Sequence, residues 1–425
     1  MTDDSSDIMY VMMDRRRGMS REAIDRLFYP FFRKNAPTCV QPAEGQLKYR
    51  YVIPSYGVKG GSDDSAAVAE RSTVGHYPQM YDWDSCFFSQ VAPRIDIKNL
   101  STDVVSNFLS LNHGDGYIPR TVSPGRIWDA GDMCKPFLAQ TLLFVHETFH
   151  EPLPTNLLSD LDCYLEYYVR TRQKEGLFHW RNVLESGIDD NLALLAPIEA
   201  AKDQNESVAY PDGRLLATDL CAYLFAEFKA VAAIATAAAN KELAAKWSKR
   251  ATDLSIAIDE RMWNEKLQMY CNVDPSNGEQ VSFRACSGLM PALFDAVKPE
   301  RIEQVFRSNI LSEQQFLRPA GVASVAVSEN LYNQAKRGLY GRARVSNWQG
   351  PMWILPNGLA VRALARHGLK REAQQVAHRA INTAINSIID HAGLFENYNA
   401  ETGAPLWAPN FMSWNILILE MLDQV

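Results

Sequence analysis

The chain has 425 residues, of which 47% are hydrophobic and 10% aromatic, so it can bury a sizeable core, and its length allows two or three domains. Its 43 Lys and Arg residues against 50 Asp and Glu give a net charge of −7 without a basic block. This balance disfavours nucleic acid or an anionic membrane as the main partner. We therefore expect a small-molecule ligand, and we leave a homo-oligomer open.

The seven cysteines are scattered, odd in number and without a CxxC pair, which is typical of buried thiols in a reducing compartment. Neither the cysteines nor the eight histidines show metal-ligand spacing, so we expect no catalytic metal and no other cofactor. The N-terminus lacks the order of a secretory signal, and no apolar run approaches the roughly 18 residues of a membrane span. The sequence predicts a cytoplasmic protein.

Helical patterns dominate after about the first seventy residues, and strand-like alternation is rare. The clearest helix pair covers residues 220–262, where Leu220, Leu224 and Phe228 recur at helical spacing and Asn240 marks a break. Similar pairs are expected at 132–150 with 156–173, at 299–310 with 321–337, and at 350–367 with 370–389.

Helical hairpins in succession predict either an open α-solenoid or a closed double ring of helices. A solenoid would show self-similarity at a fixed period, and this chain shows none. The links between hairpins are rich in Trp, Tyr, Asp and Asn, as expected for the mouth of one site. We predict one all-α domain over residues 41–425, preceded by a segment of uncertain order at 1–40.

These links carry what glycosidic bond cleavage requires. That reaction needs a protonated acid at the leaving oxygen and a second carboxylate that activates water or attacks carbon. A sugar also needs aromatic faces and polar groups that fix its hydroxyls. The stretch LESGIDDNLAL, residues 184–194, packs Glu185, Asp189 and Asp190 into one short link.

The segment ESGIDD resembles the ESGWD or ESGMD motif of trehalases, glycoside hydrolase family 37, and of glycoside hydrolase family 63. In those families the Asp is the general acid, and it corresponds to Asp189 here. The neighbouring Asp190 is a departure from the motif and stays open as the alternative acid.

The C-terminal stretch LFENYNAETGAPLWAPNFMSW is similar to the family 63 pattern of an aromatic-flanked Glu, a TG turn and an aromatic-x-Trp element. The Glu of that pattern is the general base and corresponds to Glu396, while Trp414 closes the element. Glu401, close to the turn, is the alternative base.

The segment MYDWDSCFF resembles the WDWD segment of family 63, whose Trp and Asp line the first sugar subsite. Trp83 and Asp84 take those positions, and Tyr81 precedes them. The resemblance therefore implies that these three side chains bind substrate.

The segment SNWQGPMWILPNG is similar to WRGPxW of family 63 and to QWDxPNGWAP of trehalases. It assigns Trp348, Gln349 and Trp353 to the substrate site. Gln349 stands where family 63 has Arg, and Ile354 where trehalases have Asp, so neither role is carried over.

Two weaker matches complete the set. DGYIPRT and DMCKP are similar to trehalase segments and contribute Arg120 and Lys135 as substrate-binding cations. ATDLCAYLF is similar to a trehalase helix start and places Asp219 at the site, although a plain helix N-cap is an equal interpretation.

This resemblance implies an (α/α)6 toroid with both carboxylates at one end of the ring and an inverting mechanism. It requires a protonated Asp189, whose pKa burial or a neighbouring carboxylate such as Asp190 or Glu185 would raise. The implied substrate is a small α-linked glucoside or mannoside, such as glucosylglycerate or mannosylglycerate, whose anionic group would need Arg120, Arg126 or a nearby lysine. Two other functions stay open, namely a sugar epimerase with paired histidines and a catalytically silent sugar-binding protein.

Overall fold

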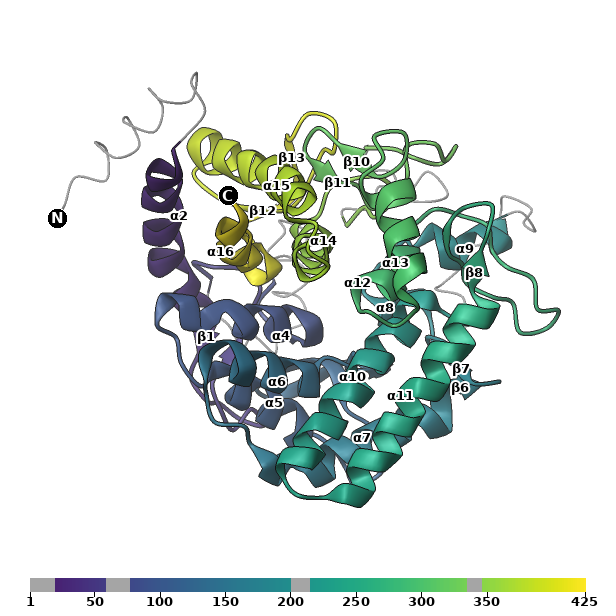
Figure 1. The fold of residues 1–425 in the computed structure, drawn as a ribbon. Coiled ribbons are helices and arrows are strands. Elements are labelled where there is room, and N and C mark those ends of the chain that lie inside the picture. Colours follow the sequence, from purple (N-terminus) through teal and green to yellow (C-terminus); the bar gives the residue numbers. More distant parts are fainter. Residues whose placement is uncertain (1–19, 59–76, 200–214, 335–345) are drawn as a thin grey trace.

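The computed structural model describes residues 20–58, 77–199, 215–334 and 346–425. Six helical elements form an inner ring, seen end-on in Figure 1, in which each contacts the next and the last returns to the first. In ring order they are α4 (Asp82–Val91), α6 (Leu138–Phe149), α10 (Thr218–Ala237), α12 (Met290–Leu293), α14 (Ile354–Arg366) and η7 with α16 (Ser413–Leu417 and Ile418–Met421). Closure of this ring distinguishes the fold from an open solenoid.

A second ring of helices packs outside the first (Figure 1). It comprises α2 (Arg21–Asn35), α5 (Leu100–Ser110), α7 (Leu158–Arg172), α11 (Lys241–Arg261), α13 (Pro299–Val305) and α15 (Lys370–His391). The two rings confirm the predicted all-α toroid.

The sequence of each helix follows its position in the double ring. The outer helix α15 buries Val376, Ala380 and Ile381 and exposes charged side chains on its other face, as a surface helix does. The inner helix α10 is buried on almost all sides between its neighbours and α11, whose N-terminus is capped by the Asn240 side chain.

Within the described residues, α10 is the one helix long and apolar enough, by length and composition, to cross a membrane. The expectation that no apolar segment approaches that length was therefore wrong for this helix. Its most apolar window is 72% buried inside the molecule. We attribute its hydropathy to its place in the inner ring.

Short antiparallel strands occupy the links between helices. The largest sheet joins β3 (Met80–Tyr81), β4 (Pro119–Ser123) and β5 (Arg126–Met133), and a hairpin joins β12 (Phe395–Tyr398) to β13 (Pro405–Pro409). The other pairs are β1 (Val40–Gln41) with β2 (Tyr51–Val52), β6 (Gln173–Lys174) with β7 (Leu177–Phe178), β8 (Trp263–Asn264) with β9 (Met269–Tyr270), and β10 (Leu317–Arg318) with β11 (Gly321–Val322). Two further short helices, α8 (Val183–Ser186) and α9 (Leu192–Glu199), flank the ESGIDD link.

The helix predicted at 321–337 is wrong in its described part, because residues 321–334 form β11 and an irregular segment, and 335–337 lie outside the described residues. Backbone pairing with distant parts of the chain replaces helical bonds here. Ala323 pairs with Met352, and the Ser324 N–H donates to the Pro351 carbonyl oxygen at 3.0 Å. A helix would have to give up these bonds.

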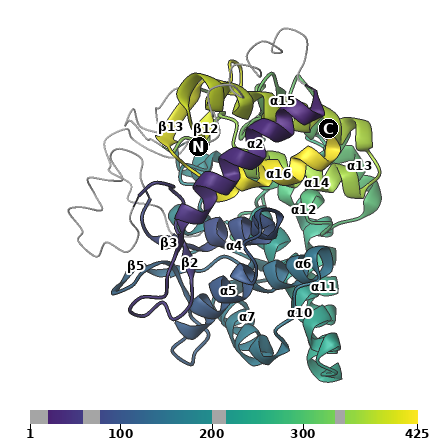
Figure 2. The same ribbon diagram turned by 90° about the vertical axis from the view of Figure 1, so that its left-hand side faces the viewer.

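Helix α2 lies within the segment 1–40, whose order the sequence left uncertain. Residues 1–19 of that segment lie outside the described residues. Helix α2 buries Phe28 and Phe32 and lies beside the C-terminal helix α16 (Figure 2). The Arg21 guanidinium also donates to the Val425 carbonyl oxygen at 2.8 Å, so the two ends of the described chain meet at one seam of the ring.

All seven cysteines are free thiols, and six of them are buried.

Candidate active site

A pocket of about 80 Å³ lies at the end of the ring where α4, α14 and η7 begin. Every residue of its lining comes from a link or from the first turn of an inner element. The lining consists of Pro54, Tyr77, Tyr81, Trp83, Asp84, Arg120, Gly187, Asp189, Ser346, Trp348, Glu396, Phe411 and Trp414. Segments between Pro54 and Asp189 thus meet segments between Ser346 and Trp414 in one small cavity.

Asp189 and Glu396 both face this pocket, although they are far apart in the chain. Asp189 lies in the link after α8 and is half-buried, whereas Glu396 lies on β12 and is 5% exposed. Burial and the nearby Asp189 carboxylate raise the pKa of Glu396 well above its ordinary value, and a hydrogen bond from the Tyr77 hydroxyl (3.0 Å) opposes that rise. The two carboxyl groups therefore influence each other's charge.

The alternative acid and the alternative base take other positions. Asp190 is buried outside the pocket lining, and its carboxylate accepts the Trp348 backbone N–H at 2.8 Å. Glu401 lies in the turn between β12 and β13, where the Arg318 guanidinium donates to both its oxygens at 2.7 and 2.8 Å. Asp190 therefore stabilises the segment that carries Trp348, and Glu401 stabilises the turn that follows Glu396.

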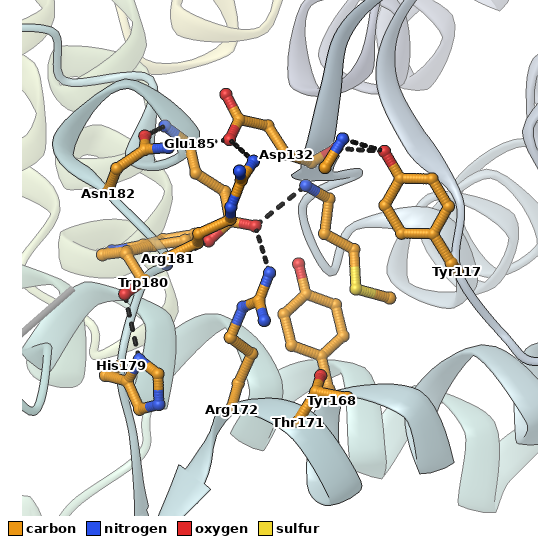
Figure 3. A network of polar contacts seen from close by, with 12 residues as sticks. Tyr117, Asp132, Tyr168, Thr171, Arg172, His179, Trp180, Arg181, Asn182 and Glu185 are labelled. Carbon is orange, nitrogen blue, oxygen red and sulfur yellow. Dashed lines mark hydrogen bonds and ion pairs between the residues drawn. The ribbon is translucent and has the colours of Figure 1, made fainter. Parts of the chain in front are cut away.

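Glu185, the third carboxylate of LESGIDDNLAL, is fully buried in a polar network (Figure 3). It accepts hydrogen bonds from the Arg172 guanidinium and the Met133 N–H, both at 2.9 Å, and from the Arg181 N–H. The Asn182 side chain caps α8 by accepting the Glu185 N–H at 2.7 Å. These bonds tie the ESGIDD link to α7 and β5, so Glu185 supports the position of Asp189.

Gly187 permits the sharp turn between Glu185 and Asp189. Its φ is +76°, and a Cβ there would lie 2.7 Å from both Trp83 and Lys135 side-chain atoms. Any residue larger than glycine would therefore have a strained backbone here, and its Cβ would clash with Trp83 and Lys135. The turn directs the chain that follows it into the pocket.

Tryptophan side chains pack together at the base of the pocket. Trp348 stacks on Trp353 with ring centroids 3.8 Å apart, and Trp83 lies 6.1 Å from Trp348 and 5.7 Å from Trp414. The indole N–H groups of Trp348 and Trp414 are buried and have no hydrogen-bond partner within the described residues. A polar ligand in the pocket could satisfy both donors.

Asp84 is almost fully buried and also lines the pocket. The Ser413 hydroxyl donates to its carboxylate at 2.6 Å, and burial raises its pKa from 3.8 to about 7 despite that bond. Arg120, also at the pocket, opposes the rise through its charge and donates to the Leu184 carbonyl oxygen. Asp84 is thus poised to change its protonation state near neutral pH.

Lys135 was predicted to bind substrate, but it does not line the pocket. Its ammonium group is fully buried, forms an ion pair with Asp82 at 3.1 Å and lies 4.7 Å from the ring centroid of Trp83. The backbone N–H of Lys135 donates to Asp82 as well. Lys135 therefore lies behind the pocket lining, where it contacts Trp83 and Asp82.

Three other predicted residues also lie behind the lining. Trp353 packs under Trp348, and the Gln349 side-chain oxygen accepts from the Asn333 amide at 2.8 Å. Asp219 accepts the Trp180 indole N–H at 2.9 Å and lies in the first turn of α10, whose N-cap is Ala217. The N-cap interpretation of Asp219 was therefore wrong.

Sequence reasoning did not select Pro54, Tyr77, Gly187, Ser346 or Phe411 as pocket residues. Gly187, Ser346 and Phe411 lie inside the motifs already quoted, so the motif residues beside them were the signal that could have identified them. Tyr77 lies just before MYDWDSCFF, and no motif marked it. Its position depends on tertiary contacts with Ser55 and Phe411, which are distant in the sequence.

A closed double ring of helices, with carboxylates and aromatic side chains gathered in a pocket at one end, defines the class of toroidal glycoside hydrolases. The sequence model of the mannosylglycerate hydrolase MGH1-like glycoside hydrolase domain matches residues 77–414. The chain therefore belongs to the MGH1-like glycoside hydrolase family.

Solved structures agree at the level of the fold. The mannosylglycerate hydrolase of glycoside hydrolase family 63 from Thermus thermophilus, in complex with glucose, is 16% identical with a TM-score of 0.68, covering 93% of this chain and 100% of that chain. Neutral trehalase Nth1 from Saccharomyces cerevisiae is 13% identical with a TM-score of 0.59, covering 89% and 74%. A bacterial glucoamylase complexed with acarbose is 12% identical with a TM-score of 0.55, covering 82% and 49%.

Proposed function

We propose that the protein is an inverting glycoside hydrolase that cleaves a small α-linked glucoside or mannoside, with Asp189 as general acid and Glu396 as general base. One observation carries this proposal. The two carboxyl groups reach the same aromatic pocket from links at distant points of the chain, and they are close enough to affect each other's protonation.

The chemistry follows from one proton held by the pair. Asp189 donates its proton to the glycosidic oxygen as the bond to the anomeric carbon breaks. A water molecule attacks that carbon from the opposite face, and Glu396 accepts a proton from this water. The sugar is released with inverted configuration, and exchange with solvent restores the original protonation of the two groups.

Electrostatics supports an unequal sharing of charge. Two neighbouring carboxylates that repel each other do not both ionise readily, so the pair retains a proton over a wider pH range than separate groups would. Tyr77 stabilises the ionised form of Glu396 through its hydrogen bond. The proposed mechanism assigns the retained proton to Asp189.

The pocket lining supports a sugar as ligand. The face of a pyranose can pack on the Trp83 and Trp348 rings, while its hydroxyls can pair with Asp84 and with the unpaired indole N–H groups. Arg120 offers positive charge to an anionic aglycone, as in glucosylglycerate or mannosylglycerate. No histidine is among the described residues of the lining, so the geometry does not favour an epimerase with paired histidines.

Proton NMR of the purified protein with glucosylglycerate, mannosylglycerate, trehalose, sucrose and glucosylglycerol tests the proposal directly. We expect one α-linked substrate to release the β-anomer first, and Asp189→Asn and Glu396→Gln each to lose at least about a thousandfold in kcat. Asp190→Asn and Glu401→Gln are matched controls, because they alter carboxylates outside the lining.

Release of the α-anomer first would contradict the inverting mechanism. Full activity in Asp189→Asn or Glu396→Gln would contradict the assigned roles. Binding of a sugar by the folded protein, without cleavage of any of these glycosides, would favour the silent sugar-binding function instead.

A further inference from the structure

Tyr77 and Trp407 form a chain of polar contacts that ends on Glu396. The Tyr77 hydroxyl donates to Oε2 of Glu396 at 3.0 Å, and the Trp407 side chain acts on Tyr77 and lowers the pKa of its hydroxyl. An indole N–H can only donate. Its effect can therefore fall only on the Tyr77 oxygen, and the Tyr77 proton is directed to the carboxylate.

We propose that Tyr77, oriented by Trp407, is a positioning residue that holds Oε2 of Glu396 through its hydrogen bond and leaves the other oxygen, Oε1, to receive the proton of the attacking water. This inference rests on the proposed function and deepens it. It assigns a task to Tyr77, which lies outside the quoted motifs, and to Trp407, which lies inside the C-terminal one.

The position of Tyr77 is set by several elements. Its ring meets the Tyr81 ring edge-on at a centroid distance of 5.9 Å and the Phe411 ring at 5.7 Å. Its backbone N–H donates to the Ser55 hydroxyl at 3.0 Å. A ring held on both edges and at its backbone can present its hydroxyl in one direction without a large loss of side-chain entropy on catalysis.

The charges around Glu396 make this hydrogen bond necessary. Burial, the Asp189 carboxylate and the Asp84 carboxylate all raise the pKa of Glu396, whereas the bond from Tyr77 lowers it. The Tyr77 hydroxyl itself stays protonated, because burial and Glu396 raise its pKa well above 10. The titratable and charged groups that share the pocket with Glu396 are Tyr77, Tyr81, Asp84, Arg120 and Asp189.

Tyr77→Phe keeps the ring and removes only the hydroxyl. Tyr332→Phe is the matched control, because the Tyr332 hydroxyl also donates to a carboxylate, that of Glu401 at 2.5 Å, outside the pocket lining. Trp407→Phe removes the donor that orients Tyr77 and serves as the second variant if Tyr77→Phe does not fold. Thermal denaturation checks the fold of each protein.

The primary measurement is a 13C NMR titration of protein labelled at Glu Cδ, with the Glu396 signal identified by its loss in Glu396→Gln. We expect Tyr77→Phe to raise the pKa of Glu396 by about one unit, Trp407→Phe to raise it less, and Tyr332→Phe to leave it unchanged. The acidic limb of kcat/KM should move by the same amount, with kcat about tenfold lower and KM nearly unchanged.

An unchanged titration of Glu396 in Tyr77→Phe would overturn the inference, and so would a shifted titration with an unchanged pH profile of kcat/KM. The NMR titration needs no turnover. If the wild-type protein cleaves no glycoside, the proposed function fails and the water-positioning task fails with it, while the titration still decides whether Tyr77 controls the charge of Glu396.

Discussion

Replacing Asp84 by Asn should stabilise the protein, and increasingly so as the pH rises. Burial raises the pKa of Asp84 from 3.8 to about 7, so the folded state holds a proton that the unfolded state releases. The stability contributed by that proton is complete below pH 3.8 and is lost as the pH rises through about 7. Asn resembles the protonated form and does not lose it, and its side-chain oxygen can still accept from Ser413.

The size of the effect follows from the same two pKa values. The difference corresponds to about 2 kcal/mol in favour of Asp84→Asn at pH 5 and about 4 kcal/mol at pH 8. Water that reaches the pocket screens the charge of Asp84 and reduces this difference. If Asp84 binds a sugar hydroxyl as proposed, the same variant should also lose activity, so stability and function would change in opposite directions.

Urea denaturation of both proteins at pH 5 and pH 8 measures this difference. Asp253→Asn is a suitable control, since it alters an exposed ion pair with Lys249 and should change stability by less than about 0.5 kcal/mol at both pH values. Equal stability of wild type and Asp84→Asn at pH 8, or a gain that does not grow with pH, would refute the reasoning.

Three further substitutions test the residues that support the pocket and the positive charge that lines it. Gly187→Ala should destabilise the protein by about 2 kcal/mol in thermal denaturation, because of its positive φ and the clash with Trp83, and an unchanged Tm would show that the turn can relax. Glu185→Gln should cost about 3 kcal/mol, because it leaves the buried Arg172 guanidinium without its anion, and a loss below about 1 kcal/mol in urea denaturation would contradict this. Arg120→Ala should raise KM about tenfold for a glycerate-linked substrate and much less for a neutral one, and equal effects in steady-state kinetics would exclude the anionic contact.

The helices that the sequence predicted well are those whose apolar period is long and uninterrupted. The pair expected at 220–262 corresponds to α10 and α11 with the break at Asn240, and the pair expected at 350–367 with 370–389 corresponds to α14 and α15. Helix α2 was missed although it buries a periodic face, because no motif drew attention to it. The segment after residue 321 was predicted as a helix, since its bonds to Pro351 and Met352 cannot be read from its own composition.

The short link LESGIDDNLAL shows what the sequence by itself determined and what only the tertiary structure decided. The motif predicted that this link carries an acid of the site, because residue types and their spacing are local properties. It could not separate the tasks of Glu185, Asp189 and Asp190. In the folded chain Glu185 pairs with Arg172, Asp190 accepts the Trp348 N–H, and Asp189 alone of the three lines the pocket. The direction of each carboxylate depends on partners from distant helices and links, and ring closure brings those partners into contact.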